Sequence, residues 1–172
     1  MRRAGLTALA SFAALALSYS FPAGVRAQSA PTPDYSPLEF LVGSCWVAAF
    51  PGGSATDTHC FEWMYGRHFI RDRHVVSSAP TYEGETVYGW NPLEKRIEWR
   101  YWSNDGMVMD GRVEPRGEDI VFPATYATPA AVAEIRAVWT RRGPDTYRAV
   151  QSQKTGDEWK TVLTVEYRRK AR

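Results

Sequence analysis

Cysteine and histidine are both scarce in this 172-residue chain, and the scarcity excludes several kinds of site. The two cysteines, Cys45 and Cys60, are too far apart for the Cys-x-x-Cys pair of a redox centre. The three histidines form no His-Glu-x-x-His motif of the kind that binds zinc. No serine lies in a Gly-x-Ser-x-Gly elbow, so a serine hydrolase is not indicated. The sequence therefore assigns no catalytic residue and no metal ligand.

A long amphipathic helix is missing as well. From Gly43 onward, short runs rich in Val, Ile, Thr, Tyr, Phe and Trp alternate with Gly, Pro and Asn turn signals, at about a dozen residues per strand and turn. The runs cover residues 44–51, 56–65, 68–77, 82–90, 95–103, 107–114, 118–123, 132–141, 145–153 and 158–168. Only residues 37–42 look helical. The pattern predicts an all-β fold, an antiparallel up-and-down β-barrel of about 8–10 strands with a short N-terminal helix over one end. A β-sandwich is the alternative.

The first 27 residues predict a secretory signal peptide. Arg2 and Arg3 precede an apolar stretch over residues 6–21, and Val25 and Ala27 are the small residues before the cleavage site that we place after Ala27. The apolar stretch is short for a membrane span, so an uncleaved anchor is the less favoured alternative. We therefore expect a periplasmic or secreted protein, with a flexible leader over residues 28–36 and one barrel domain over residues 37–169.

Charge of one sign is also lacking once the signal is removed. The whole chain has 21 basic and 19 acidic residues, a net charge of +2. The signal segment contains Arg2, Arg3 and Arg26 and no acidic residue, so the remaining chain has 18 basic residues against 19 acidic ones, a net charge of −1. A chain of this charge has no electrostatic preference for nucleic acid or anionic lipid, and we expect neither as a partner.

The two cysteines predict a disulfide bond and, with it, a strand register. In a secreted protein a cysteine pair is usually bonded, and a loop of about fifteen residues adds roughly 3 kcal/mol of stability in the chain-entropy model. A bond needs both side chains on one face of the sheet, which places Trp46 on the opposite face. That second face is the more apolar, so we expect it to line the interior. The expected pairs are Tyr65 with His68 across a Gly66-Arg67 turn, Trp63 with Ile70, Glu62 with Arg71, Phe61 with Asp72, and His59 with His74.

This register predicts a polar cluster inside the barrel, made of His59, His68, Asp72 and His74. Two imidazoles and a carboxylate can bind a metal ion or act as acid and base. The alternative, which we favour in the absence of a motif, is that these groups satisfy one another by hydrogen bonds. A register slip of one residue would turn all of them to the outside.

Several segments resemble a known group of proteins. The segment LEFLVGSCW at residues 38–46 is similar to the start of the calycin-type, lipocalin-like proteins, in which a short helix leads into a strand bearing Gly-x-Trp. The segments at residues 59–63, 65–71 and 88–92 resemble one bacterial family of unknown function in that group, distantly related to haem-binding nitrobindin-like barrels. The resemblance covers residues 37–169.

The resemblance implies an antiparallel barrel in which Trp46 packs against a late basic residue, Arg168 or Arg169. The chain departs from the pattern by one residue, because Ser44 and Cys45 both separate Gly43 from Trp46. A β-bulge would accommodate the extra residue and would change which side chains face inward. Related haem-binding barrels take their iron ligand from a late histidine, and none follows His74, so haem is disfavoured and no cofactor is expected.

The leading functional hypothesis is a binding barrel for a small hydrophobic or amphipathic molecule. The candidate interior residues are Trp46, His59, Phe61, Trp63, His68, Asp72, His74, Tyr88, Trp99 and Tyr101. The first alternative is an enzyme that uses the interior His/Asp cluster. The second is a non-catalytic envelope protein that acts through its outer surface.

Overall fold

The computed structural model describes residues 32–127 and 132–171, so the predicted signal peptide and part of the predicted leader lie outside the described residues. One 3-10 turn, η1 (Glu39–Leu41), precedes the strands. The strands are β1 (Ser44–Ala49), β2 (Thr56–Met64), β3 (Phe69–Val76), β4 (Tyr82–Asn91), β5 (Arg96–Ser103), β6 (Val108–Arg112), β7 (Glu114–Arg116), β8 (Asp119–Ala127), β9 (Val132–Gly143), β10 (Thr146–Thr155) and β11 (Glu158–Arg169). The predicted helix over residues 37–42 is thus a single 3-10 turn.

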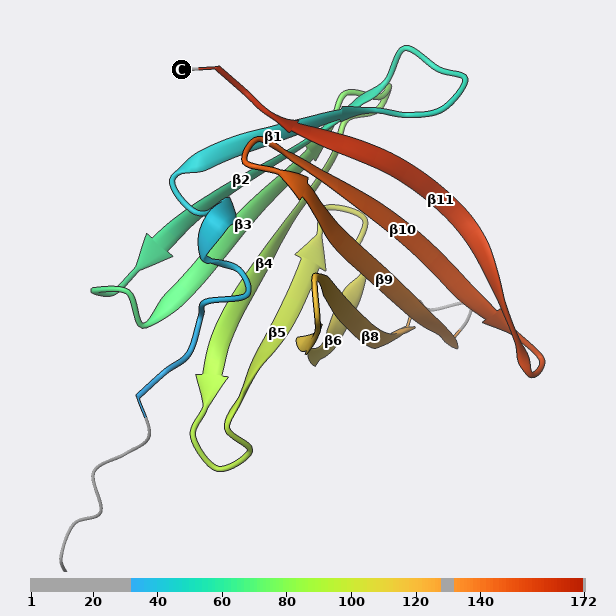
Figure 1. The fold of residues 1–172 in the computed structure, drawn as a ribbon. Helices are drawn as coiled ribbons and strands as arrows, with labels where there is room; N and C mark the ends of the chain where they lie inside the picture. The colour runs from blue at the N-terminus through green and yellow to red at the C-terminus, as the bar shows by residue number, and fades with distance from the viewer. Residues whose placement is uncertain (1–31, 128–131, 172) are drawn as a thin grey trace, which may run out of the picture.

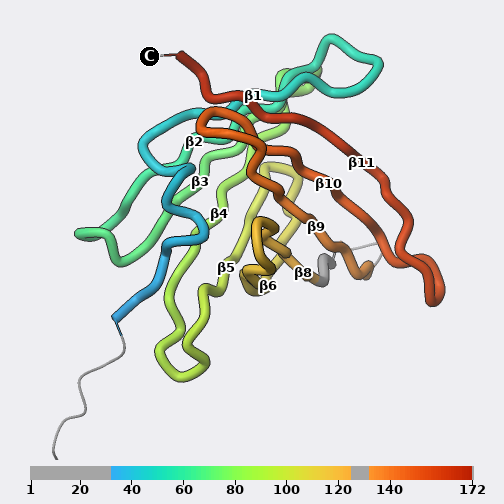
Figure 2. The backbone as a smooth tube through the Cα atoms, viewed as in Figure 1, coloured from blue at the N-terminus to red at the C-terminus, as the bar shows by residue number. Residues whose placement is uncertain are grey.

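The strands form one closed antiparallel barrel (Figure 1). Apart from β6 and β7, which both pair with β8, each strand pairs with its neighbours in the chain, and β1 pairs with β11. The short β7 continues β6 past Val113 and pairs with the same neighbour, β8, so the barrel wall is ten strands wide. Figure 2 traces the meander, in which the last strand returns beside the first. The predicted barrel is confirmed, and closure excludes the sandwich because the wall has no gap between two sheets.

The predicted register of β1, β2 and β3 is also confirmed. Cys45 lies opposite Cys60, His59 opposite His74, and the β1–β2 pairing runs without a shift from Ser44 to Ala49. The extra residue before Trp46 therefore causes no bulge in this pairing, and the predicted inner face of both strands stands.

The turn between β2 and β3 differs from the prediction. Met64 pairs with Phe69, so the loop comprises four residues, Tyr65 to His68, rather than two. Its first three residues all have positive φ, from 48° to 71°. The predicted two-residue turn makes His68 part of the strand and turns its side chain to the interior. In the structure His68 belongs to the loop, and its side chain is exposed.

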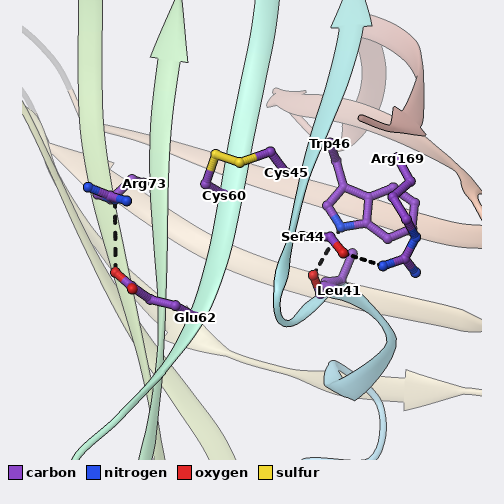
Figure 3. The surroundings of a disulfide bond; sticks show 8 residues. All are labelled: Leu41, Ser44, Cys45, Trp46, Cys60, Glu62, Arg73 and Arg169. Atoms are coloured by element: carbon purple, nitrogen blue, oxygen red, sulfur yellow. Dashed lines mark hydrogen bonds and ion pairs between the residues drawn. A yellow bond between two sulfur atoms is a disulfide. The ribbon is translucent and has the colours of Figure 1, made fainter. Parts of the chain in front are cut away.

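The disulfide lies on the outside of the barrel, and Trp46 on the inside (Figure 3). Cys45 and Cys60 are bonded across neighbouring strands, with Cα atoms 4.0 Å apart. The Trp46 indole nitrogen donates a hydrogen bond to the Leu41 carbonyl at 3.0 Å, and the Arg169 guanidinium lies 4.4 Å from the ring centroid. The predicted contact between Trp46 and a late basic residue is confirmed, and the basic residue is Arg169.

The half of the barrel at the η1 end is filled with side chains, and we call it the filled half. Leu38, Leu41, Trp46, Ile70 and Tyr147 have no solvent exposure. Leu41 of η1 and the preceding Leu38 pack into the barrel core at this end. Apolar burial of this kind is the main favourable contribution to folding.

One residue of the predicted flexible leader packs against the barrel. Tyr35 is buried against Trp63, with the ring centroids 5.4 Å apart. Its hydroxyl donates a hydrogen bond to the His68 carbonyl at 2.5 Å. In the part of the chain that the structure describes, no helix is long and apolar enough to cross a membrane.

Candidate functional site

A cavity of about 550 Å³ occupies the other half of the barrel, which we call the hollow half. It reaches the end opposite η1, because its lining includes Phe50 just after β1, Val76 at the end of β3 and Tyr82 at the start of β4. Aromatic and aliphatic side chains from β6, β8, β9, β10 and β11 form one wall. These include Met109, Phe122, Ile135, Trp139, Ala149 and Val165.

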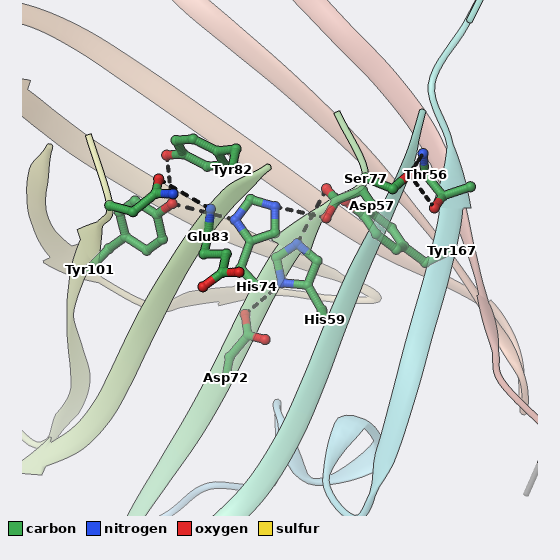
Figure 4. Close-up of polar contacts among 11 residues, drawn as sticks. Thr56, Asp57, His59, Asp72, His74, Ser77, Tyr82, Glu83, Tyr101 and Tyr167 are labelled. Carbon is green, nitrogen blue, oxygen red and sulfur yellow. Dashed lines mark hydrogen bonds and ion pairs between the residues drawn. The ribbon is translucent and has the colours of Figure 1, made fainter. Parts of the chain in front are cut away.

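The opposite wall carries a polar cluster that we define by seven residues. They come from β2, β3, β4, β5 and β11 (Figure 4). The members are Asp57, His59, Asp72, His74, Tyr82, Tyr101 and Tyr167. Strand alternation explains why four of them meet: Asp57 and His59 are two apart on β2, Asp72 and His74 are two apart on β3, and the register puts the histidines opposite each other.

His59 is held between two carboxylates. Its Nδ1 lies 2.6 Å from Asp72 Oδ2, and its Nε2 lies 3.5 Å from Asp57 Oδ2. Burial by itself lowers the pKa of His59, but the charge of Asp72 and the interactions with both carboxylates outweigh burial and raise this pKa from 6.5 to about 10. His59 is therefore protonated at neutral pH when no other cation is present.

The Asp57 carboxylate is contacted by three side chains, those of His59, His74 and Tyr167. His74 Nε2 lies 2.7 Å from its Oδ1, and the Tyr167 hydroxyl donates to its Oδ2 at 2.6 Å. Burial by itself raises the pKa of Asp57, but the interactions with His59 and His74 outweigh it and hold the pKa well below its usual range. Burial and the neighbouring Asp57 charge raise the pKa of Tyr167 far above 10, which keeps its hydroxyl as a donor.

The network extends from His74 to two tyrosines. His74 Nδ1 lies 3.4 Å from the Tyr101 hydroxyl, which donates to the Tyr82 hydroxyl at 2.6 Å. Burial and the Tyr82 hydrogen bond raise the pKa of Tyr101 well above its ordinary value. Gly84 makes this arrangement possible, because a Cβ at that position would come within 2.2 Å of the Tyr101 hydroxyl oxygen.

The structure divides the ten predicted interior residues into three groups. Six line the cavity: His59, Asp72, His74, Tyr88, Trp99 and Tyr101. Trp46, Phe61 and Trp63 face inward but do not line the cavity. The third group is His68 alone, which is exposed in the β2–β3 loop. The predicted inner face is thus right for the strands, but only part of it lines the cavity.

Sequence reasoning missed Asp57, Tyr82 and Tyr167. Asp57 had a usable signal, since it stands two residues before His59 on the same strand and must share its face. Tyr167 had none, because its contact with Asp57 spans 110 residues and depends on barrel closure between β1 and β11.

The geometry limits the chemistry that this cluster can perform by itself. A general base works best with a pKa near the working pH, and His59 is protonated far above neutrality. Both of its ring nitrogens face carboxylates. The cluster instead provides a fixed arrangement of donors and acceptors against an apolar wall, which is the composition of a binding pocket.

The comparisons with known proteins add no further constraint to this picture. No protein-family model matches the chain, and no match was found among curated proteins.

Proposed function

We propose that this protein is an extracytoplasmic binding barrel for a small, partly apolar molecule. The observation that carries the proposal is the cavity of about 550 Å³, which is within the size range of small-molecule sites. A barrel of ten strands is wide enough to leave interior space that side chains do not fill. The outward-facing disulfide supports an oxidising compartment, since such bonds persist outside the cytosol.

The two walls of the cavity indicate the chemical character of the ligand. Trp139, Phe122 and Ile135 offer an apolar surface for a ring or alkyl chain. The cluster on the facing wall offers polar groups that orient one polar end. An amphipathic molecule with one polar terminus satisfies both walls. The resemblance of residues 37–169 to lipocalin-like barrels favours the same class of ligand.

The test is binding of an apolar fluorescent probe, N-phenyl-1-naphthylamine, to the metal-free protein. We expect saturable binding that quenches the fluorescence of the cavity tryptophans, Trp99 and Trp139. Ala137→Trp fills the cavity from β9 and should abolish probe binding. Ala49→Trp is the matched control, because Ala49 is exposed on β1 and does not line the cavity.

Equal binding by wild type and Ala137→Trp would contradict the proposal. If Ala137→Trp does not fold, Ala149→Phe introduces bulk from β10 instead. Native mass spectrometry of protein purified from its host under mild conditions would then identify a resident ligand by its added mass.

A further inference from the structure

Three side chains of the polar cluster converge in a way that mutual hydrogen bonding does not fully explain. Asp57 Oδ1 and His74 Nε2 lie 2.7 Å apart, yet both are buried without a hydrogen bond of acceptable geometry. His59 Nε2 approaches the same carboxylate. One potential ligand atom from each of these three residues lies within 4.8 Å of the others.

Asp72 and Tyr101 lie where hydrogen-bond acceptors lie behind metal-binding histidines, next to the ring nitrogen that does not bind the metal. A histidine that ligates a metal through one ring nitrogen normally donates the other N–H to a carboxylate or another oxygen, which fixes the ring. His59 Nδ1 faces Asp72 Oδ2 at 2.6 Å, and His74 Nδ1 faces the Tyr101 hydroxyl at 3.4 Å. Both rings therefore turn their Nε2 atoms toward Asp57 (Figure 4).

The charges in the cluster also suit a divalent cation. Asp57 and Asp72 are both buried, with 4% and 1% of their surface exposed. Two buried carboxylates need two positive charges nearby, since an unbalanced buried charge is costly. A divalent ion supplies both charges while leaving the two imidazoles neutral, which is the form that binds metal.

The donor set narrows the kind of ion. Two imidazole nitrogens and one carboxylate oxygen suit zinc and neighbouring first-row transition ions, whereas magnesium and calcium prefer oxygen ligands alone. Three protein ligands leave a coordination position free, as in catalytic rather than structural zinc sites. All three residues line the cavity, so that position is accessible to a small molecule.

We propose that Asp57, His59 and His74 bind one divalent transition-metal ion of the zinc class, with Asp72 and Tyr101 as positioning residues and the remaining coordination position facing the cavity. The site stands on its own geometry and does not require the binding of an apolar molecule.

The experiment titrates the disulfide-bonded protein, freed of metal by chelator and gel filtration, with Zn²⁺ in a calorimeter and with Co²⁺ in a spectrophotometer. We expect one ion per chain and visible Co²⁺ absorption bands of a low-symmetry nitrogen–oxygen site. His74→Gln should weaken binding by at least about 100-fold, and Asp72→Asn by about 10- to 100-fold. The control is His68→Gln, because His68 is exposed in the β2–β3 loop and should leave the affinity unchanged.

Absence of stoichiometric Zn²⁺ and Co²⁺ binding by the wild-type protein would overturn the proposal. So would binding that His68→Gln removes and His74→Gln preserves. If His74→Gln does not fold, Asp57→Asn takes its place, and the wild-type Co²⁺ spectrum decides independently of any variant. The apolar probe is measured on metal-free protein, so failure of the metal site leaves the test of the proposed ligand pocket intact.

Discussion

The two halves of this barrel are built from the same ten strands but differ in what occupies the interior. In the filled half, Trp46 and Tyr147 are completely buried and contact each other with centroids 5.2 Å apart. In the hollow half, a cavity of about 550 Å³ separates an apolar wall from a cluster of charged and polar groups. The wall of the barrel alone therefore does not determine whether its interior is solid; the side chains at each level do.

The difference indicates a division of roles along the barrel axis. The filled half packs large side chains against η1 and anchors Arg169, which bonds to the Phe40 carbonyl at 3.0 Å and to Asp145 at 2.8 Å. Buried polar atoms without a well-formed hydrogen bond occur in both halves, but the filled half has one at the Tyr147 hydroxyl, whereas Asp57 Oδ1, Asp72 Oδ1 and His74 Nε2 gather in the hollow half. Unsatisfied buried polar atoms cost stability and concentrate at functional sites. The filled half supplies stability on which the hollow half depends.

The largest effect is expected from emptying the filled half. Trp46→Ala removes a fully buried indole together with its hydrogen bond to Leu41, so the free energy of unfolding should fall by about 3–5 kcal/mol. Urea unfolding followed by circular dichroism measures this loss. Trp102→Ala is the control, since Trp102 lies exposed on the outer face of β5 and should cost less than about 1 kcal/mol. Comparable losses in the two variants would remove the distinction between the halves.

The next effect concerns the disulfide that joins β1 and β2. Replacing Cys45 and Cys60 together by serine opens a loop with a sequence separation of 15 and should lower the free energy of unfolding by roughly 3 kcal/mol. Because the bond lies outside the barrel, the folded double variant should bind the apolar probe as well as the wild type does. Probe binding that disappears at temperatures where the variant is still folded would show that the disulfide shapes the cavity.

The hollow half should give the protein a pH-dependent stability. His59 has a folded-state pKa of about 10 against 6.5 in the unfolded chain, so its contribution is complete below about pH 6.5 and is lost as the pH rises toward 10. Asp57 has a lowered pKa, so its contribution is lost as the pH falls below its ordinary range near 4.

For metal-free protein we expect the free energy of unfolding to fall by a few kcal/mol between pH 6.5 and 10, because each unit of difference between the folded and unfolded pKa corresponds to about 1.4 kcal/mol. Urea midpoints at half-unit pH intervals measure the decline. His59→Gln should flatten this curve while lowering it, and an undiminished slope in that variant would assign the titration to another group.

The smallest effect is expected from adding bulk to the hollow half. Ala137→Leu places its extra atoms in the cavity and should change the free energy of unfolding by less than about 1 kcal/mol. Ala48→Leu makes the same change at a fully buried position that does not line the cavity and should cost about 1–3 kcal/mol. Thermal unfolding of both variants makes the comparison, and equal costs would mean that the cavity wall is as tightly packed as the core.

Much of the fold was predictable because its signals are local. Alternating apolar residues and turn dipeptides located ten strands, and the cysteine pair set the register of β1 against β2. That register predicts His59 opposite His74, which is their position in the structure. The prediction failed at His68 because the β2–β3 loop is two residues longer than a tight turn, so strand alternation ends at Met64.

The sequence by itself determined the all-β meander, the disulfide and the inner face of the first strands, since each depends on residues near one another in the chain. Only the tertiary structure decided which inward residues fill space and which surround a cavity. The extent of the cavity depends on closure of the barrel, which brings β11 beside β1. Closure also places the Tyr167 hydroxyl against Asp57, 110 residues earlier in the chain. Alternation of apolar and polar residues along a strand determines which side chains face the interior. Whether they leave a cavity depends on the sizes of the side chains that all ten strands contribute at the same height along the barrel axis.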